Sequence, residues 1–547
     1  MSLRGELVAK LRTQPVDLLV IGGGIVGAGL TRDAAMRGLR VALIDKGDFA
    51  SGTSSKTSKL IHGGLRYLEH GQLRLVFQSL KERHILRSIA PQLVWPLSLT
   101  IPLYRGDPRP RWQIMCGLAL YDLLALSRNP QAHRMVSVRE SLNREPAFNP
   151  DGLLGTASYG DCQMDDARLC LANVLQAVSC GAVCCNYVAL RAFTKTSGRI
   201  SGAVVQDSRT SEVFEIRARV VVNATGPWSD AVRRLSDSTA TARVTPTKGI
   251  HLVIPRLTHQ AVLFQARWNR RMIFLLPWGD YSLLGTTESA EAGDLDALRA
   301  NANEVDYLLG EVNRIIPDAG SRVHAERIIA TFAGARPLLA FSGSSTRASR
   351  EHRIEVDRYG LVSVMGGKYT TFRAMAQHAL DLIVKRFGLR AERCLTSRIS
   401  LLEPAHPVVL NRWQEVTSRM APEVLARLLT RYGTGAFRIL ELVEFEPGLA
   451  QAVCPHHDVM QAELVYGMRE ELACTISDLL VRRTTIAYSA CQGLDLLSTL
   501  TDLLQRYGRV SREDLEEQVA GYRRVLADSL AFSASPPRHT QAVVTPR

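Results

Sequence analysis

The chain has 547 residues, of which 46% are hydrophobic and 22% charged, so two or three domains with sizeable cores are expected. The formal net charge of +14 suits an anionic partner, such as a phosphate ester, an anionic bilayer or a nucleic acid. The arginines are scattered and no aromatic residues alternate with a basic stripe, which argues against nucleic acid.

A glycine-rich turn near the N-terminus predicts a nucleotide-binding loop. It follows a strand expected at 16–21 and contains Gly22, Gly24 and Gly27. In a dinucleotide-binding turn the first glycine permits the tight bend, the second lets the backbone approach the pyrophosphate, and the third lets helix pack on strand.

The helix and strand that follow complete a βαβ unit. The helix is expected at 25–37 and the second strand at 41–44, directly before Asp45. Asp45 lies about 20 residues beyond the glycines, where an acidic side chain accepts a hydrogen bond from a ribose hydroxyl.

The run after Asp45 favours FAD over NAD. An NAD-binding chain would usually proceed to another βα unit, whereas residues 49–59 are small, polar and rich in hydroxyl groups. Their amides and hydroxyls are expected to line the diphosphate and flavin, and the glycine loop at 60–67 is expected to pass close to the ring. A solvated serine loop is the structural alternative. The cofactor candidates of these two stretches are Thr53, Ser54, Ser58, Lys59, His62, Gly63 and Gly64.

Residues 91–150 are expected to leave the nucleotide domain as an excursion that faces substrate or membrane. A basic lip at 105–112 leads into a mostly apolar helix at 114–121, a pattern typical of surface binding to a membrane, with core packing as the alternative. No run reaches the ~18 apolar residues that a membrane-spanning helix needs.

The ten cysteines show no paired framework, and the N-terminus lacks the apolar core of a secretory signal, so a reducing cytosol is expected. Cys180, Cys184 and Cys185 invite a metal interpretation. No second ligand pair stands at zinc spacing, so small buried thiols and no metal site are predicted.

Two later segments are expected to return to the dinucleotide. In the first, Asp165 begins a helix as its N-cap, and a buried strand at 218–222 runs into a glycine turn at Ala224 and Gly226. In the second, a strand and glycine turn at 360–373 close the FAD site with Gly367, Lys368 and Thr370.

The predicted fold is α/β: a Rossmann-like FAD-binding domain of the glutathione-reductase or D-amino-acid-oxidase type, an antiparallel substrate sheet and a helical C-terminal domain. Apolar residues recur with a period of 3.6 beyond residue 396. The FAD-binding domain comprises residues 16–90, 151–240 and 341–395; the excursion is 91–150, the substrate domain 241–340, the helical domain 396–533, and a disordered tail 534–547.

Five motifs resemble the FAD-dependent, respiratory glycerol-3-phosphate dehydrogenases, in the same order along the chain and over roughly residues 17–390. Asp45 stands where a glutamate is also usual, and Ile250 stands where a small polar residue is common; neither removes a charge from the expected site. The motifs are His-Gly-Gly-Leu-Arg-Tyr at 62–67, Asn-Ala-Thr-Gly-Pro-Trp at 223–228, Lys-Gly-x-His at 248–251, Ala-Arg-Pro-Leu at 335–338 and Gly-Gly-Lys-x-Thr-Thr at 366–371.

Alcohol oxidation by a flavin needs a base for the hydroxyl proton, a C–H bond aimed at flavin N5, and cations for any phosphate. A histidine in an apolar strand is more often structural, but the resemblance makes His251 the first candidate for the base and leaves His62 as its competitor. Arg336, held by the following proline, is expected to orient the hydroxyl or stabilise negative charge on the flavin. The candidates for binding substrate are Arg66, Tyr67, Arg271 and Lys368.

The resemblance implies oxidation of sn-glycerol 3-phosphate to dihydroxyacetone phosphate by hydride transfer from C2 to flavin N5. It also implies that electrons pass to a membrane quinone and that the enzyme lies peripherally on the cytoplasmic face of the membrane; homodimerisation is left open. The alternatives are a glycerol-3-phosphate oxidase that uses O2, an amine or amino-acid oxidase of the same fold, and a flavin-containing RNA-binding protein.

Overall fold

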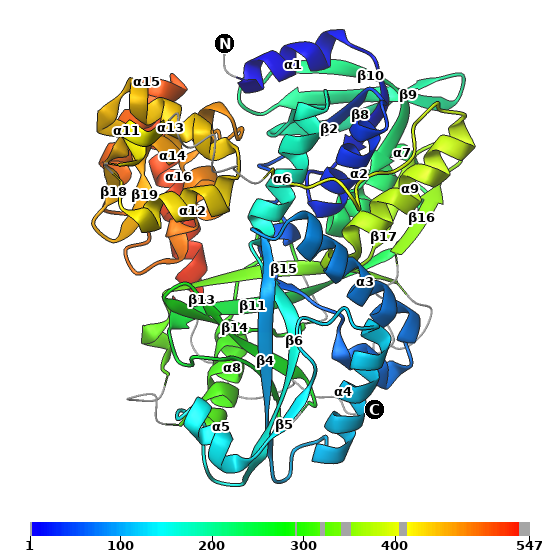
Figure 1. The fold of residues 1–547 in the computed structure, drawn as a ribbon. Helices are drawn as coiled ribbons and strands as arrows, with labels where there is room; N and C mark the ends of the chain where they lie inside the picture. Colours follow the sequence, from blue (N-terminus) through cyan, green and yellow to red (C-terminus); the bar gives the residue numbers. More distant parts are fainter. Residues whose placement is uncertain are drawn as a thin grey trace.

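Two sheets and a helical domain make up the fold (Figure 1). The computed structural model describes residues 3–267, 269–289, 293–317, 323–340, 352–403, 413–418 and 420–534. The predicted disordered tail lies almost entirely outside these residues.

The first sheet is the predicted Rossmann-like core. Its strand order is β16-β17-β10-β1-β2-β7, with β9 added to β10 and β8 to β9. The pairs β17–β10, β10–β1, β1–β2 and β2–β7 are parallel. The strands are β1 (Val16–Ile21), β2 (Val41–Ile44), β7 (Val183–Cys185), β8 (Val188–Thr196), β9 (Arg199–Asp207), β10 (Val213–Asn223), β16 (His352–Val356) and β17 (Val362–Gly366).

Helices cover the faces of this sheet, so β1 and β2 are apolar along almost their whole length, as buried parallel strands are. Helix α2 (Ile25–Met36) packs between α6 (Asp166–Ser179) and α9 (Phe372–Phe387). The predicted N-cap is confirmed, since Asp165 Oδ1 accepts a hydrogen bond of 3.0 Å from the Arg168 amide. Further helices are α1 (Leu3–Thr13) and α7 (Ser229–Ser236).

The second sheet is the predicted substrate sheet. Its order is β15-β11-β14-β13-β12-β4-β6-β3, with β5 on β6, and every pair is antiparallel except β4 with β12. Helix α8 (Ala302–Ile315) covers the face that carries Ile250 and Leu252. The strands are β3 (Leu60–Ile61), β4 (Val94–Tyr104), β5 (Arg134–Val136), β6 (Leu153–Met164), β11 (Val244–Pro255), β12 (Ala261–Gln265), β13 (Met272–Trp278), β14 (Tyr281–Gly285) and β15 (Ala330–Leu339).

This sheet includes residues that the sequence analysis assigned to the excursion and to the FAD-binding domain. Strands β4 and β6 pair antiparallel from Val94 opposite Met164 to Tyr104 opposite Leu153. The expected excursion at 91–150 therefore contributes a full strand to the substrate sheet. The return to the first sheet comes after Met164, not at residue 151. Helices α3 (Leu73–Ile89), α4 (Arg111–Ala125) and α5 (Val138–Arg144) belong to the same region.

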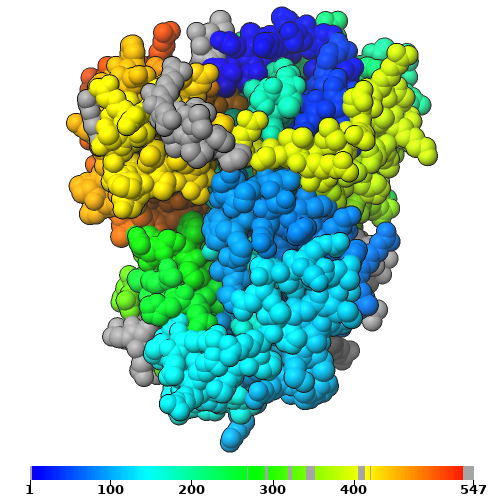
Figure 2. All heavy atoms as spheres, viewed as in Figure 1, coloured from blue at the N-terminus to red at the C-terminus, as the bar shows by residue number. Residues whose placement is uncertain are grey.

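The C-terminal domain is helical, as predicted, and has its own apolar core. It lies beside the two sheets, in yellow to orange in Figure 1, and Figure 2 shows its atoms against the blue and green parts of the surface. A two-stranded hairpin, β18 (Ala452–Cys454) and β19 (His457–Met460), is inserted among its helices. The helices are α11 (Gln414–Thr417), α12 (Pro422–Tyr432), α13 (Gly435–Phe445), α14 (Gln461–Arg469), α15 (Leu497–Gly508) and α16 (Arg512–Leu530).

Buried ion pairs join this domain to the loop after Asp45. Arg482 and Arg483 lie 2.6 Å and 2.7 Å from Oδ2 of Asp48, whose side chain is fully buried. Burial alone would raise the pKa of Asp48, but the two guanidinium groups hold it well below its ordinary value. The charge of Asp48 therefore depends on arginines that lie more than 400 residues further along the chain.

We expect Arg483→Met to lower the free energy of unfolding by about 3–5 kcal/mol, because it leaves a buried carboxylate with less compensation. Arg512→Met is the matched control, since the Arg512–Glu516 pair is exposed, and should cost less than about 1 kcal/mol. Urea unfolding of the two variants checks this. Equal urea midpoints for the two variants would contradict the prediction that the buried pair of Asp48 and Arg483 stabilises the fold.

Candidate functional site

A cavity of about 880 Å³ opens between the two sheets. The ends of β1, β2, β10 and β17 lie on one side and residues of β11 and β15 on the other, so both sheets contribute to one site. Predicted site residues that line the cavity are Gly22, Gly24, Asp45, Thr53, Ser54, Ser58, His62, Ala224, Gly226, His251, Arg336, Gly367, Lys368 and Thr370.

The glycine turn forms part of the cavity wall through Gly22 and Gly24. Gly22 has φ +108°, and a Cβ there would stand 2.7 Å from the carbonyl oxygen of Ala224. A Cβ on Gly24 would meet only the Ser54 hydroxyl, at 3.2 Å. The turn thus leaves bare backbone facing the cavity, as a pyrophosphate requires. Gly27 lies behind it, where a Cβ would stand 1.9 Å from the Gly22 carbonyl oxygen, so its role is close helix packing.

Asp45 is held rigidly at the end of β2. Its carboxylate accepts hydrogen bonds from the Gly23 amide at 2.6 Å and the Gly47 amide at 2.8 Å. Burial raises the pKa of Asp45 to about 6, and the two amides oppose that rise. The side chain lines the cavity, where a ribose hydroxyl can reach it.

Besides Gly27, three predicted cofactor residues do not line the cavity. Lys59 Nζ donates to Asp166 Oδ1 at 2.5 Å and to the Ser55 carbonyl at 2.7 Å, so its charge is used to fix the serine-rich loop. The Gly63 amide donates to the Tyr121 hydroxyl at 2.8 Å, and a Cβ on Gly64 would meet the Tyr67 ring. These residues shape the loop without facing the cavity.

Strands β11 and β15 present one shared face to the cavity. Thr247 pairs with Arg336, Gly249 with Gly334, and His251 with Phe332. Paired residues of a sheet point to the same side, so His251 and Arg336 lie on the cavity face with two glycines between them. A Cβ on Gly249 would stand 2.5 Å from Arg336 Nη2, so the glycine leaves room for the guanidinium.

His251 is buried and uncharged. Its Nε2 lies 2.8 Å from the Ser58 hydroxyl, and its ring stacks on Phe332 with 5.0 Å between centroids. Burial, then the charges of Arg336 and Lys59, hold the pKa of His251 well below its ordinary value. Nδ1 has no hydrogen-bond partner within the described residues, so this buried nitrogen is available to a ligand.

Two residues that directly follow β14 fix the orientation of the Arg336 guanidinium. Its Nη2 donates to the Thr286 hydroxyl at 2.8 Å and to the Thr287 carbonyl at 3.1 Å. Arg336 and His251 both line the cavity, and the charge of Arg336 lowers the pKa of His251, so the two side chains can contact the same bound molecule.

His62 and Lys368 both line the cavity and contact each other. Lys368 Nζ donates to the His62 carbonyl, and the Thr370 hydroxyl lies 3.3 Å from both the amide and the carbonyl of His62. Gly367, with φ +93°, makes the turn that brings Lys368 to the start of α9.

Three predicted substrate ligands do not line this cavity. Arg66 is exposed, and Tyr67 packs beneath Lys368, whose Nζ lies 5.4 Å from the ring centroid. Arg271 pairs with Glu288 at 3.1 Å. Of the four residues expected to bind substrate, only Lys368 reaches the cavity wall.

Sequence reasoning did not single out some residues that line the cavity or contact its side chains. Lys56 is a cation in the serine-rich loop, and residues 188–191 of β8 approach from an edge of the first sheet. Gly285 lies opposite His251, where a Cβ would stand 2.2 Å from the imidazole. Lys56 could have been picked out as a charge within the loop, but Gly285 could not, because only the strand register reveals it.

The three cysteines considered for metal binding are free thiols. Cys184 and Cys185 are buried in β7, as predicted. Cys180 is exposed, contrary to the prediction, because it follows α6 at the surface.

Residues 17–382 match the family of FAD-dependent oxidoreductases, and residues 394–515 match the C-terminal domain of alpha-glycerophosphate oxidase. Glycerol-3-phosphate dehydrogenase 2 of Mycobacterium tuberculosis is 35% identical over 95% of this chain and 90% of its own. The glycerol-3-phosphate dehydrogenase of Synechocystis is 34% identical over 94% of this chain and 97% of its own. The structure of the Bacillus halodurans glycerol-3-phosphate dehydrogenase with FAD superposes with a TM-score of 0.79, at 26% identity over 97% of this chain and 98% of that one.

The fold and the cavity define an FAD-dependent oxidoreductase, and the predicted cofactor is confirmed. The chain belongs to the family of FAD-dependent glycerol-3-phosphate dehydrogenases. The bare glycine turn and the buried acid at the end of β2 fit the pyrophosphate and ribose of this cofactor.

Gly22→Ala should weaken FAD binding by at least about tenfold, because its Cβ would force the turn away from Ala224 and strain a positive φ. Gly38→Ala is the control: Gly38 also has a positive φ, of +80°, but a Cβ there meets nothing within 4 Å. Titration of each apoprotein with FAD measures both affinities. Equal loss in the two variants would show that backbone strain alone, not the close approach at Ala224, is responsible.

Proposed function

We propose that this enzyme oxidises sn-glycerol 3-phosphate to dihydroxyacetone phosphate and passes the electrons to a quinone. The observation that carries the proposal is the shared face of β11 and β15, which sets His251 and Arg336 over the FAD cavity. Family membership and the names of the relatives support the substrate.

His251 takes the proton of the C2 hydroxyl in this proposal. A base must be neutral before it acts, and the lowered pKa keeps the imidazole neutral at pH 7. Ser58 and Phe332 hold the ring in one orientation. His62 remains the competing base, since it also lines the cavity.

Bound FAD supplies the two-electron acceptor, with flavin N5 as the atom that receives the C2 hydride. Arg336 stabilises the negative charge that develops on the substrate oxygen or the flavin, and Thr286 fixes its direction. Lys368 is the first candidate for the phosphate because it is the predicted substrate ligand on the cavity wall. Arg66, Tyr67 and Arg271 do not line the cavity, so their part in substrate binding stays a prediction.

The quinone and the membrane form a further part of the proposal. No helix within the described residues is long and apolar enough to cross a bilayer. Helix α4 buries Leu118 and Tyr121 but exposes Trp112 (66%) and Leu123 (69%), next to the exposed Arg111. An apolar face with a basic lip suits peripheral binding to an anionic membrane on the cytoplasmic side, where a quinone is available. Homodimerisation stays a prediction.

His251→Asn should slow flavin reduction by sn-glycerol 3-phosphate about 10²–10⁴-fold, the usual contribution of a general base. In the unaltered enzyme, the lowered pKa keeps the neutral imidazole in place as pH falls, so the reduction rate should stay flat through pH 6.5 and fall only in more acidic solution. Anaerobic stopped-flow absorbance measures both effects.

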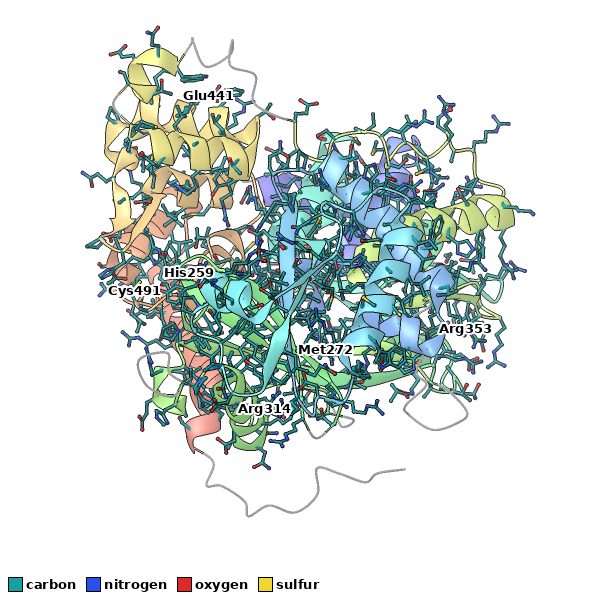
Figure 3. All side chains as sticks on the ribbon, turned by 60° about the horizontal axis from the view of Figure 1, so that its bottom comes forward. His259, Met272, Arg314, Arg353, Glu441 and Cys491 are labelled. Atoms are coloured by element: carbon teal, nitrogen blue, oxygen red, sulfur yellow. The ribbon has the colours of Figure 1, made fainter. Side chains whose placement is uncertain are left out.

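His259→Asn, an exposed histidine labelled in Figure 3, is the matched control and should keep the normal rate. Near-normal flavin reduction in His251→Asn would show that His251 is not the base and would leave His62 as the candidate.

Arg336→Ala should retain FAD, but its rate of flavin reduction should fall about 10²–10³-fold. The exposed Arg353→Ala is its control and should keep the normal rate.

Replacing Trp112 and Leu123 together by serine should reduce cosedimentation with phosphatidylglycerol vesicles several-fold, because it removes the apolar face of α4. Val213→Ser is the control, since Val213 is exposed on β10. Unchanged cosedimentation of the double variant would place the membrane-binding surface elsewhere.

A further inference from the structure

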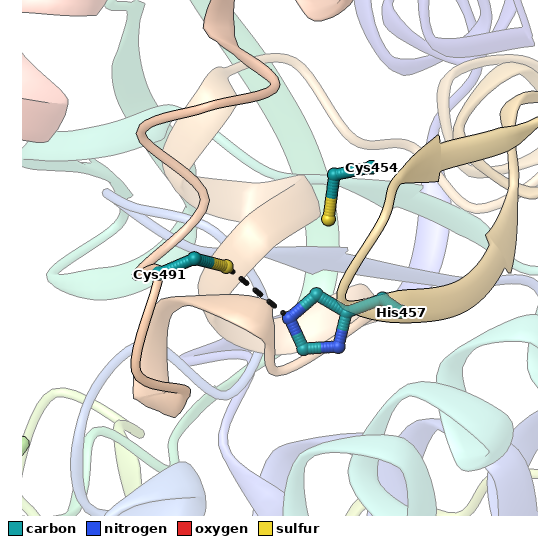
Figure 4. Close-up of side chains that lie close together, drawn as sticks. All are labelled: Cys454, His457 and Cys491. Carbon is teal, nitrogen blue, oxygen red and sulfur yellow. Dashed lines mark hydrogen bonds between the residues drawn. The ribbon is translucent and has the colours of Figure 1, made fainter.

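Two thiols and an imidazole converge in the helical domain, away from the FAD cavity. Cys454 ends β18, His457 begins β19, and Cys491 lies in the loop after the short helix Ile486–Tyr488. Their ligand atoms all lie within 4.8 Å of one another, and Figure 4 shows the three side chains facing a common point. Within the described residues this is the one such group of three.

We propose that Cys454, His457 and Cys491 form a structural zinc site. Tetrahedral zinc, with bonds of about 2.3 Å to sulfur and 2.0–2.1 Å to nitrogen, places its sulfur and nitrogen ligands about 3.6 Å apart. The separation of Cys491 Sγ and His457 Nε2 is 3.4 Å. This pair therefore already stands near the separation that zinc requires, and Cys454 Sγ lies within 4.8 Å of both atoms.

The local backbone supports this assignment. Cys454 and His457 are three residues apart on the turn of a two-stranded hairpin, a spacing common among structural zinc sites, and the third ligand comes from a distant loop. The Ser489 hydroxyl lies 2.9 Å from His457 Nε2, and metal binding replaces that hydrogen bond.

Asp495 is the candidate for the fourth ligand. Its Oδ2 lies 3.8 Å from His456 Nε2, so its carboxylate stands beside the hairpin turn that carries Cys454 and His457. Two thiolates, an imidazole and a carboxylate select zinc over magnesium or calcium, which prefer oxygen ligands throughout.

The site would fasten the helical domain to the substrate sheet. Figure 3 labels Cys491 on the side of the molecule that carries this domain. In the same loop, Gln492 Nε2 donates to the Ile329 carbonyl at 2.7 Å, and the Tyr488 ring lies 5.7 Å from that of Phe332. Phe332 in turn stacks on His251, so two ring contacts connect Tyr488, three residues before Cys491, with the candidate base.

The direct test is zinc analysis of the purified FAD-loaded chain after equilibration with Zn²⁺ and desalting. The wild type should retain a stoichiometric amount, and Cys491→Ser and His457→Gln should lose it while they keep FAD. Cys180→Ser, an exposed thiol of α6's end, is the matched control and should retain zinc. Equal zinc contents in all four proteins would overturn the proposal.

Two measurements on the wild type alone guard against variants that fail to fold. Co²⁺ in place of zinc should give thiolate-to-cobalt absorption together with tetrahedral bands at wavelengths longer than those of oxidised flavin. Zinc should also protect Cys454 and Cys491 from alkylation, located by peptide mass spectrometry, and leave Cys180 reactive. Absent cobalt bands, unprotected thiols, or a Cys454–Cys491 disulfide in the freshly isolated protein would each contradict the site.

Discussion

The parallel pairing of β1 with β10 is the constraint on which the site depends. Ile21 stands opposite Asn223, so Gly22 and Ala224 leave the sheet side by side. Their close approach permits no side chain at Gly22, and it turns both chain segments into the same cavity. The carboxyl ends of β2 and β17 open at this edge as well, which is where ligands bind in open α/β sheets.

Two buried ion pairs support the loop that borders the cavity, and the candidate base is uncharged. Lys59 is neutralised by Asp166, and Asp48 by Arg483 from the helical domain. These pairs hold the loop between Asp45 and His62 in place, and burying them without partners would be costly. His251 lies among cations and apolar rings, so it remains neutral and able to accept a proton.

Local patterns predicted the parts of the fold that local chemistry determines. The glycine turn, Asp45 and the N-cap at Asp165 follow from spacing within one βαβ unit or one helix, and the period of 3.6 predicted the helical domain. Sequence reasoning missed the strand at 94–104 and the contacts of Gly285, because strand register joins residues far apart in the chain. Arg66 and Arg271, predicted from the same local patterns to bind substrate, are not among the residues that line the cavity, and their role stays a prediction.

The central claim is that sn-glycerol 3-phosphate reduces the flavin of this protein. Anaerobic mixing of the purified yellow protein with that substrate tests it, followed by addition of either a soluble quinone or air. We expect rapid bleaching of the visible flavin band and return of the colour with quinone but only slowly with air; rapid recovery in air would instead indicate an oxidase. No bleaching by sn-glycerol 3-phosphate would contradict the proposed activity.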